Sequence, residues 1–339
     1  MMCKRMFPET HFCWKALAVV ALLTLPAAGL AATCTMQDEM PAAEQTALAD
    51  AGMRILQAIA TQDETTVKAA LLPAEAGAWS GIQAAVQQAG PLLNGGHLQF
   101  RDAFLLDASS QAAPADTEFF CSNASGAMNI TLAMHDLPPG RYAVLLADAL
   151  GAPLAGQVGL VLALNGASPD SASAWQLAGL SVRPGALDGH DGVWYWKRAR
   201  SLASADPWSA WYDYDLAAYI QLPFDFISSP NLQKLRQEQQ QISPTPQSAM
   251  PLSLAEGDRT WKIDSVGIDT SLREPDLDVV YESTGVTDPA ALRTEATSVM
   301  TAFLKAQPGI RANFHGLWAI AVKNGQHTPV MELPMAQIP

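Results

Sequence analysis

The chain has 339 residues, with 20 Lys and Arg against 33 Asp and Glu, and its formal net charge is −13 at pH 7. This excess of negative charge repels phosphate backbones and no basic stripe offsets it, so we expect no nucleic-acid partner. Hydrophobic residues make up 49% of the chain, and its length predicts two or three modest domains.

The N-terminus has the basic, apolar and small-residue order of a secretory signal. Lys4 and Arg5 precede an apolar run over 16–25, in which Thr24 is the one polar residue, and mostly small residues follow Pro26 up to Ala32. The run is about half of the roughly 20 residues that a membrane-spanning helix needs. We therefore predict a signal peptide over 1–32, a mature chain with no transmembrane segment, and a periplasmic or extracellular location.

Two cysteines, Cys34 and Cys121, remain after this cleavage. Cysteines of an exported chain often pair, so we predict a disulfide between them, with two unrelated thiols as the alternative. Cys34 also lies near the cleavage point, where a bacterial lipoprotein would carry its lipid. Ala31 and Thr33 fit that pattern poorly, so lipid anchoring at Cys34 is the less favoured interpretation.

Residues 33–185 are predicted to form one α+β domain. Apolar residues recur at helical spacing over 42–60, and shorter helices are expected over about 63–72 and 74–89. The spacing then changes to two, which predicts successive strands of a curved antiparallel sheet with one buried face. The alternating segments cover 98–106, 128–134, 142–146, 158–164 and 175–182.

The rest of the chain is predicted to hold a helical hairpin and a small C-terminal domain. Helices over 193–205 and 208–221 are separated at Asp206-Pro207, and a third helix over 230–241 ends the 186–241 region. Repeated prolines predict a linker over 242–258. Residues 259–339 read as a ββαββ unit, in which Asp288 caps the helix. The predicted fold class is therefore α+β.

Three helices followed by a curved sheet, with the closing strand Trp-Gln-Leu-Ala-Gly-Leu at 175–180, resemble the NTF2-like (SnoaL-like) cone domain over about 42–183. A β-sandwich preceded by helices is the alternative. The hairpin resembles a single tetratricopeptide-like unit at Ala199, Ala218 and Pro223. The chain as a whole resembles uncharacterised secreted bacterial proteins that join such pieces.

The cone resemblance implies either an enzyme with acid–base residues inside the cone or an inert binding module. Asp102 shares parity with Leu98, Phe100, Phe104 and Leu106, so a regular strand would point its carboxylate inward. A carboxylate on an apolar face has a raised pKa and can act as a general base. A bulge or an arginine partner would instead remove Asp102 from catalysis, and we favour this alternative.

Aromatic residues concentrate in 194–226, with carboxylates between them. Such a cluster either holds a carbohydrate or packs the hairpin against a neighbouring domain. We favour packing, against the N-terminal domain. The candidate ligand-binding residues under the carbohydrate alternative are Trp194, Trp196, Trp211 and Tyr214.

Other polar residues give weaker signals. His190-Asp191 lies in a Gly-rich turn, where Asp191 is expected to cap the next helix, and His315 is interpreted as a turn histidine. Motifs for zinc, calcium, phosphate and dinucleotides are absent from the sequence, so we expect no metal and no cofactor.

Taken together, these patterns favour an exported, non-enzymatic envelope or extracellular protein that binds a protein partner or a small ligand. A cone-fold hydrolase or isomerase that uses Asp102, and a carbohydrate-binding protein that uses the 194–226 aromatic residues, are the alternatives.

Overall fold

The computed structural model describes residues 32–126, 128–166 and 168–339. The predicted signal peptide lies outside this range except for its last residue. Among the described residues, no helix combines the length and the apolar character that crossing a bilayer requires. Helices and mostly antiparallel sheets together confirm the predicted α+β class.

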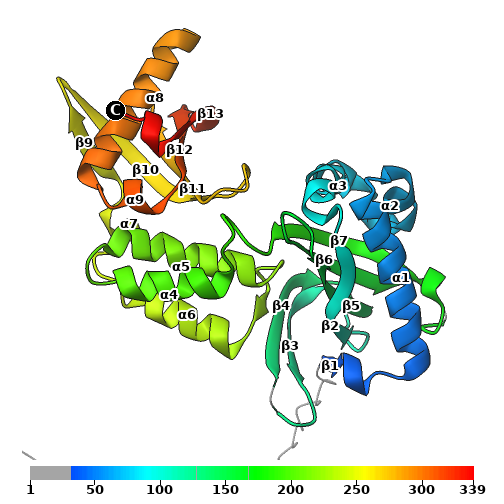
Figure 1. Ribbon diagram of the computed structural model, residues 1–339. Coiled ribbons are helices and arrows are strands. Elements are labelled where there is room, and N and C mark those ends of the chain that lie inside the picture. The colour runs from blue at the N-terminus through cyan, green and yellow to red at the C-terminus, as the bar shows by residue number, and fades with distance from the viewer. Residues whose placement is uncertain (1–31, 127, 167) are drawn as a thin grey trace, which may run out of the picture.

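The N-terminal unit places three helices on one face of an antiparallel sheet (Figure 1). The helices are α1 (Ala42–Ala60), α2 (Glu64–Ala70) and α3 (Trp79–Leu93). The strand order is β1-β2-β5-β6-β7, and the strands are β1 (Thr33–Met36), β2 (His97–Asp107), β5 (Arg141–Leu150), β6 (Gly156–Leu164) and β7 (Trp175–Pro184). The apolar stripe of α1, with Leu48, Ile55 and Leu56 at most 1% exposed, drives this packing.

A second, smaller sheet covers the opposite face of the first one. It consists of β3 (Ala115–Ser122), β4 (Asn129–Leu137) and β8 (Ile227–Ser228). In β6, Leu160 and Leu162 pack toward the helices, whereas Val161 and Ala163 pack toward the second sheet. The prediction of one buried face was therefore wrong for the central strands, because the β3–β4 pair folds back over the sheet.

The helical region consists of α4 (Gly192–Leu202), α5 (Pro207–Gln221) and α6 (Pro230–Gln240). Asp191 caps α4 as predicted, since its carboxylate accepts a 2.8 Å hydrogen bond from the Trp194 amide. Between α5 and α6 the chain returns to the N-terminal unit, where β8 pairs with β4. Phe224 packs on Gly159 there, and a Cβ atom on Gly159 would lie only 2.2 Å from the Phe224 ring.

The C-terminal unit forms a sheet in the order β13-β12-β11-β10-β9. Its elements are α7 (Pro246–Ala249), β9 (Leu252–Glu256), β10 (Arg259–Asp269), β11 (Asp276–Glu282), α8 (Pro289–Ala306), α9 (Ile310–Asn313), β12 (Gly316–Lys323) and β13 (Gln326–Pro334). The predicted ββαββ order is present, and α8 connects the parallel strands β11 and β12. The segment 242–258, predicted as a linker, instead contains α7 and β9.

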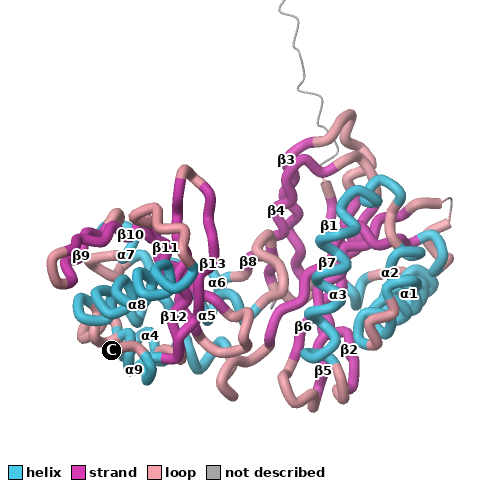
Figure 2. The backbone as a smooth tube through the Cα atoms, turned by 90° about the horizontal axis from the view of Figure 1, so that it is seen from above, coloured by secondary structure: helices cyan, strands magenta, loops and turns pink. Residues whose placement is uncertain are grey.

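The hairpin shares its core with the C-terminal unit. Figure 2 shows the C-terminal unit on one side of the molecule and the N-terminal unit on the other. The ring centroids of Trp208 and Phe303 lie 5.9 Å apart, and those of Tyr212 and Phe314 lie 6.3 Å apart. The expectation that the aromatic residues bury the hairpin against the N-terminal domain was therefore wrong for Trp194, Trp196 and Trp211, which pack against the core that the hairpin shares with the C-terminal unit. Phe224 and Phe226, at the end of the aromatic segment, do pack on the N-terminal unit.

The predicted disulfide is present between Cys34 and Cys121. It connects β1 in the first sheet to β3 in the second, across a sequence separation of 87 residues. The bond therefore fixes the two sheets to each other at the first strand of the described residues.

We expect the double substitution Cys34→Ala and Cys121→Ala to lower the free energy of unfolding by about 2–5 kcal/mol, because the loop that the bond closes is long. Urea denaturation of oxidised parent and variant measures the difference. Reduced parent protein should unfold at the midpoint of the variant, and equal midpoints for oxidised parent and variant would contradict the prediction.

Candidate functional site

A cleft of about 390 Å³ lies where the N-terminal unit, the hairpin and the C-terminal unit meet. Its walls come from α3, β7, α5, β10 and the turn that follows β10. The lining combines apolar and polar side chains, among them Val182, Tyr219, Ile268, Gln88, Asp269 and Arg273. Its volume falls in the range of small-molecule sites.

The turn after β10 holds its charged residues in a defined conformation. The Asp269 carboxylate accepts hydrogen bonds from the amide and the hydroxyl of Ser271, at 2.9 and 2.6 Å. Arg273 has a φ of 66°, in the left-handed region that side chains other than glycine rarely adopt. The Arg273 amide also donates a 2.9 Å bond to the Thr270 carbonyl. The turn thus presents one positive and one negative side chain to the cleft.

The opposite wall of the cleft is fixed by polar contacts between the hairpin and β7. The guanidinium of Arg183 lies 4.5 Å from the Tyr219 ring centroid and donates a 3.1 Å hydrogen bond to the Leu222 carbonyl. Gln157 of β6 donates its side-chain amide to the Ile220 and Pro184 carbonyls. Because these contacts bind α5 to the N-terminal unit, this side of the cleft is preformed.

A cluster of titratable side chains lies next to the cleft, at the ends of three neighbouring strands. Asp276 begins β11 and pairs with Asp269 of the cleft wall, His315 directly precedes β12, and Glu332 lies in β13. Their potential ligand atoms all lie within 4.8 Å of one another. This cluster is the set of described residues that has the composition and the spacing to hold a metal ion.

The carboxylates of this region share a desolvated environment. Burial raises the pKa of Asp276 and of Glu332 above the ordinary values; a neighbouring carboxylate adds to each shift, whereas His315 opposes both. Burial, together with Asp269 and Asp276, raises the pKa of Asp278 to about 6. Burial alone would lower the pKa of His315, but its hydrogen bond to Asp276 raises it overall. The region therefore favours protons or cations.

Asp102 lies at a bulge of β2, which falls between Phe100 and Asp102 in the pairing with β5. Its carboxylate accepts a 3.1 Å bond from Arg101, and Arg101 also contacts Asp148. The bulge turns Phe100 toward the helices and Phe104 toward the second sheet, which breaks the parity used in the prediction. These are the two features, bulge and arginine partner, that argue against a catalytic role for Asp102.

The aromatic candidates do not form one open platform. Trp196 donates a 2.8 Å hydrogen bond to Glu238 of α6, and the Tyr214 hydroxyl lies 3.4 Å from the same carboxylate. Trp194 stacks on His190 instead, with ring centroids 3.7 Å apart. Trp211 is half-buried against the core of the hairpin and the C-terminal unit. Each ring has protein partners, which favours packing over carbohydrate binding.

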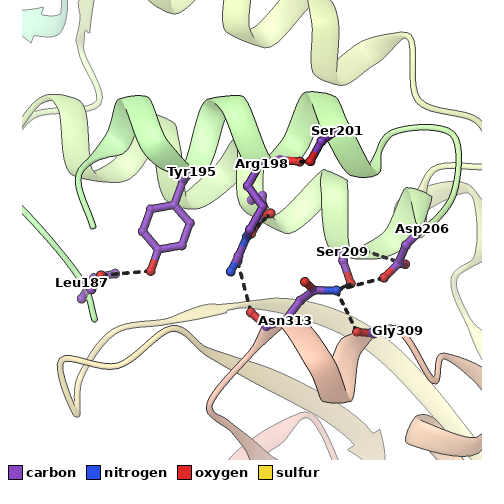
Figure 3. A network of polar contacts seen from close by, with 9 residues as sticks. Leu187, Tyr195, Arg198, Ser201, Asp206, Ser209, Gly309 and Asn313 are labelled. Carbon is purple, nitrogen blue, oxygen red and sulfur yellow. Dashed lines mark hydrogen bonds and ion pairs between the residues drawn. The ribbon is translucent and has the colours of Figure 1, made fainter. Parts of the chain in front are cut away.

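A buried polar network crosses the interface between the hairpin and the C-terminal unit (Figure 3). Arg198 of α4 makes a bidentate ion pair with the fully buried Asp213 of α5 and donates a 3.1 Å bond to the Asn313 carbonyl. The Asn313 amide in turn donates to Ser209 and to the Gly309 carbonyl, at 3.2 and 2.9 Å. Burial raises the pKa of Asp213 to about 6, although Arg198 opposes this shift.

No protein-family model, no curated protein and no solved structure matches this chain. The residues that sequence reasoning missed are Asp276 and Glu332, which belong to no short motif, and Asp269 and Arg273 of the cleft. A histidine followed by glycine at the start of a predicted strand, 315–316, was the one available signal.

We expect Asp213 to make the protein less stable as the pH rises from about 4 to about 7. Its pKa in the folded protein, about 6, exceeds the value of 3.8 for the unfolded chain. The folded state therefore binds the proton more tightly, and roughly 3 kcal/mol of stability is present below pH 4 and lost by about pH 7. Urea unfolding between pH 4 and 8 measures this, with Asp213→Asn as the control. A parent–variant difference that does not change with pH would exclude it.

Substituting alanine for an aromatic residue of the hairpin should lower the free energy of unfolding, and the loss should be larger for the more buried residue. Trp208 is 5% exposed, so Trp208→Ala should cost about 3–5 kcal/mol. Trp194→Ala, at a half-exposed position, should cost less. Thermal unfolding followed by circular dichroism gives both values, and a Trp208→Ala variant that melts like the parent would refute the packing role.

Proposed function

We propose that the mature chain is an exported, non-enzymatic binding protein of the cell envelope or the extracellular medium, and that its ligand is a small polar molecule held in the interdomain cleft. The basic and apolar N-terminus supports export. The Cys34–Cys121 bond is compatible with an oxidising compartment. A small ligand is favoured over a protein partner because the candidate site is concave.

The observation that carries this proposal is the composition of the cleft. Arg273 supplies a positive charge from the turn that follows β10, and Asp269 supplies a negative one from the last residue of β10. Tyr219 and Val182 supply apolar surface on the opposite side. Convergent polar groups against an apolar wall are the usual features of small-molecule sites. A ligand with an anionic group, a hydrogen-bond donor and a short apolar part fits this lining.

The family resemblances remain part of the proposal. Helices α1 to α3 on one face of an antiparallel sheet support an NTF2-like N-terminal domain, and the antiparallel α4–α5 pair supports a tetratricopeptide-like hairpin. An inert, ligand-binding use of the cone fits the contacts of Asp102, whose carboxylate is paired with Arg101.

A thermal-shift screen of small polar compounds, such as amino acids and dicarboxylates, tests the proposed binding. A ligand present at 100 times its Kd should stabilise the mature protein by about 2.7 kcal/mol. We expect Arg273→Ala to abolish this stabilisation, because it removes the positive charge of the cleft. Arg273 is exposed, so the variant itself should fold normally.

Arg293→Ala is the matched control, since Arg293 is an exposed arginine on α8, outside the cleft lining. It should respond to the ligand as the parent does. A ligand that stabilises parent and Arg273→Ala equally would exclude the cleft as its site. N-terminal sequencing of exported protein tests the location, and an intact Met1 or a lipid on Cys34 would contradict it.

A further inference from the structure

The strands β11, β12 and β13 bring a histidine and two carboxylates to one point of the C-terminal sheet. The Nδ1 atom of His315 lies 3.0 Å from Oδ1 of Asp276. The side chain of Asp276 is fully buried, whereas that of His315 is 41% exposed. Glu332 joins them from the next strand, within the common 4.8 Å limit. The cluster is therefore open to solvent at His315, partly covered at Glu332 and closed at Asp276.

Two carboxylate oxygens of this cluster are buried and have no hydrogen-bond partner among the residues that the structure describes. They are Oδ2 of Asp276 and Oε1 of Glu332. An unpaired buried polar atom costs free energy, and a buried carboxylate oxygen costs more than a neutral one. Both oxygens thus lack the donor or cation that a stable folded protein normally provides.

Gly316 leaves space beside the unpaired Oε1 of Glu332 and beside Oδ1 of Asp276, the oxygen that pairs with His315. A Cβ atom at this position would lie 2.4 Å from Oε1 of Glu332 and 3.0 Å from Oδ1 of Asp276. A side chain at position 316 would push the Glu332 and Asp276 carboxylates apart. The backbone of the middle strand is therefore shaped around a point at which negative groups converge.

We propose that Asp276, His315 and Glu332 bind a divalent transition-metal ion, of which Zn²⁺ is the best probe. One imidazole nitrogen with two carboxylate oxygens suits such an ion better than Ca²⁺ or Mg²⁺, which prefer ligand sets of oxygen alone. Two ligand atoms that bind one Zn²⁺ at about 2.1 Å in tetrahedral geometry stand about 3.4 Å apart. The His315 nitrogen and the Asp276 oxygen form a hydrogen bond of 3.0 Å, so they need to separate by only about 0.4 Å to bind one ion.

The electrostatic environment supports a cation at this point. Asp276 feels the negative charge of Asp269, Glu332 feels that of Asp276, and His315 is the basic group that acts on both. An ion bound between the carboxylates would remove their repulsion and give both unpaired oxygens a partner. This site is separate from the proposed ligand cleft, because its three ligands do not line that cleft.

The test is isothermal titration of metal-stripped mature protein with Zn²⁺, combined with metal analysis after dialysis. We expect one ion per chain. Loss of a group that only orients a ligand typically weakens metal binding 10–100-fold, so His315→Gln and Glu332→Gln should each weaken it by at least about tenfold. Circular dichroism of the stripped variants verifies that they fold.

His135→Gln is the matched control. His135 also lies beside a carboxylate, 3.4 Å from Asp116, but this pair is exposed and belongs to no three-ligand group of the described residues. The control should bind Zn²⁺ as the parent does. A parent that binds no Zn²⁺, or a folded His315→Gln variant that binds it as tightly as the parent, would overturn the proposal. If Mg²⁺ bound the stripped parent as tightly as Zn²⁺ does, the proposal would also be overturned.

Discussion

The α4–α5 hairpin cannot bury its own aromatic side chains, and the placement of the other parts of the molecule depends on this constraint. Two helices leave outward faces that need cover. The C-terminal unit covers one of them through Trp208 and Tyr212, and the N-terminal unit receives the end of α5 through Gln157 and Arg183. The cleft lies where the hairpin brings the N-terminal unit and the C-terminal unit next to each other.

Much of the secondary structure follows from local patterns. The 3.6-residue spacing placed α1 at 42–60, where the structure has Ala42–Ala60, and period-two segments located most strands of the first sheet. The strand β9 was missed because the surrounding prolines indicate a linker, and its pairing with β10 decides its conformation. The partner of the hairpin was also mispredicted, because an apolar face shows that it needs cover but does not identify the covering surface.

The candidate sites were much less predictable than the elements. The prediction that Asp102 lies on the same face of the sheet as Phe100 and Phe104 assumed a regular strand. The bulge between Phe100 and Asp102 places Phe100 and Phe104 on opposite faces. The Asp276, His315 and Glu332 side chains meet only because α8 returns the chain for β12 to pair in parallel with β11. That pairing is a property of the tertiary fold, so no spacing in the sequence reveals it.

The return of the chain at 222–228 has a mechanical consequence. The chain leaves the N-terminal unit after β7, passes through α4 and α5, and comes back to pair with β4 and to seat Phe224 on Gly159 before it continues to α6. The hairpin is thus tethered to the N-terminal unit at both of its ends, while it shares one core with the C-terminal unit. The hairpin and the C-terminal unit therefore behave as one rigid body that is joined to the N-terminal unit by two chain segments, 185–191 and 222–228. Any rotation of this body relative to the N-terminal unit must change the conformation of both segments at once.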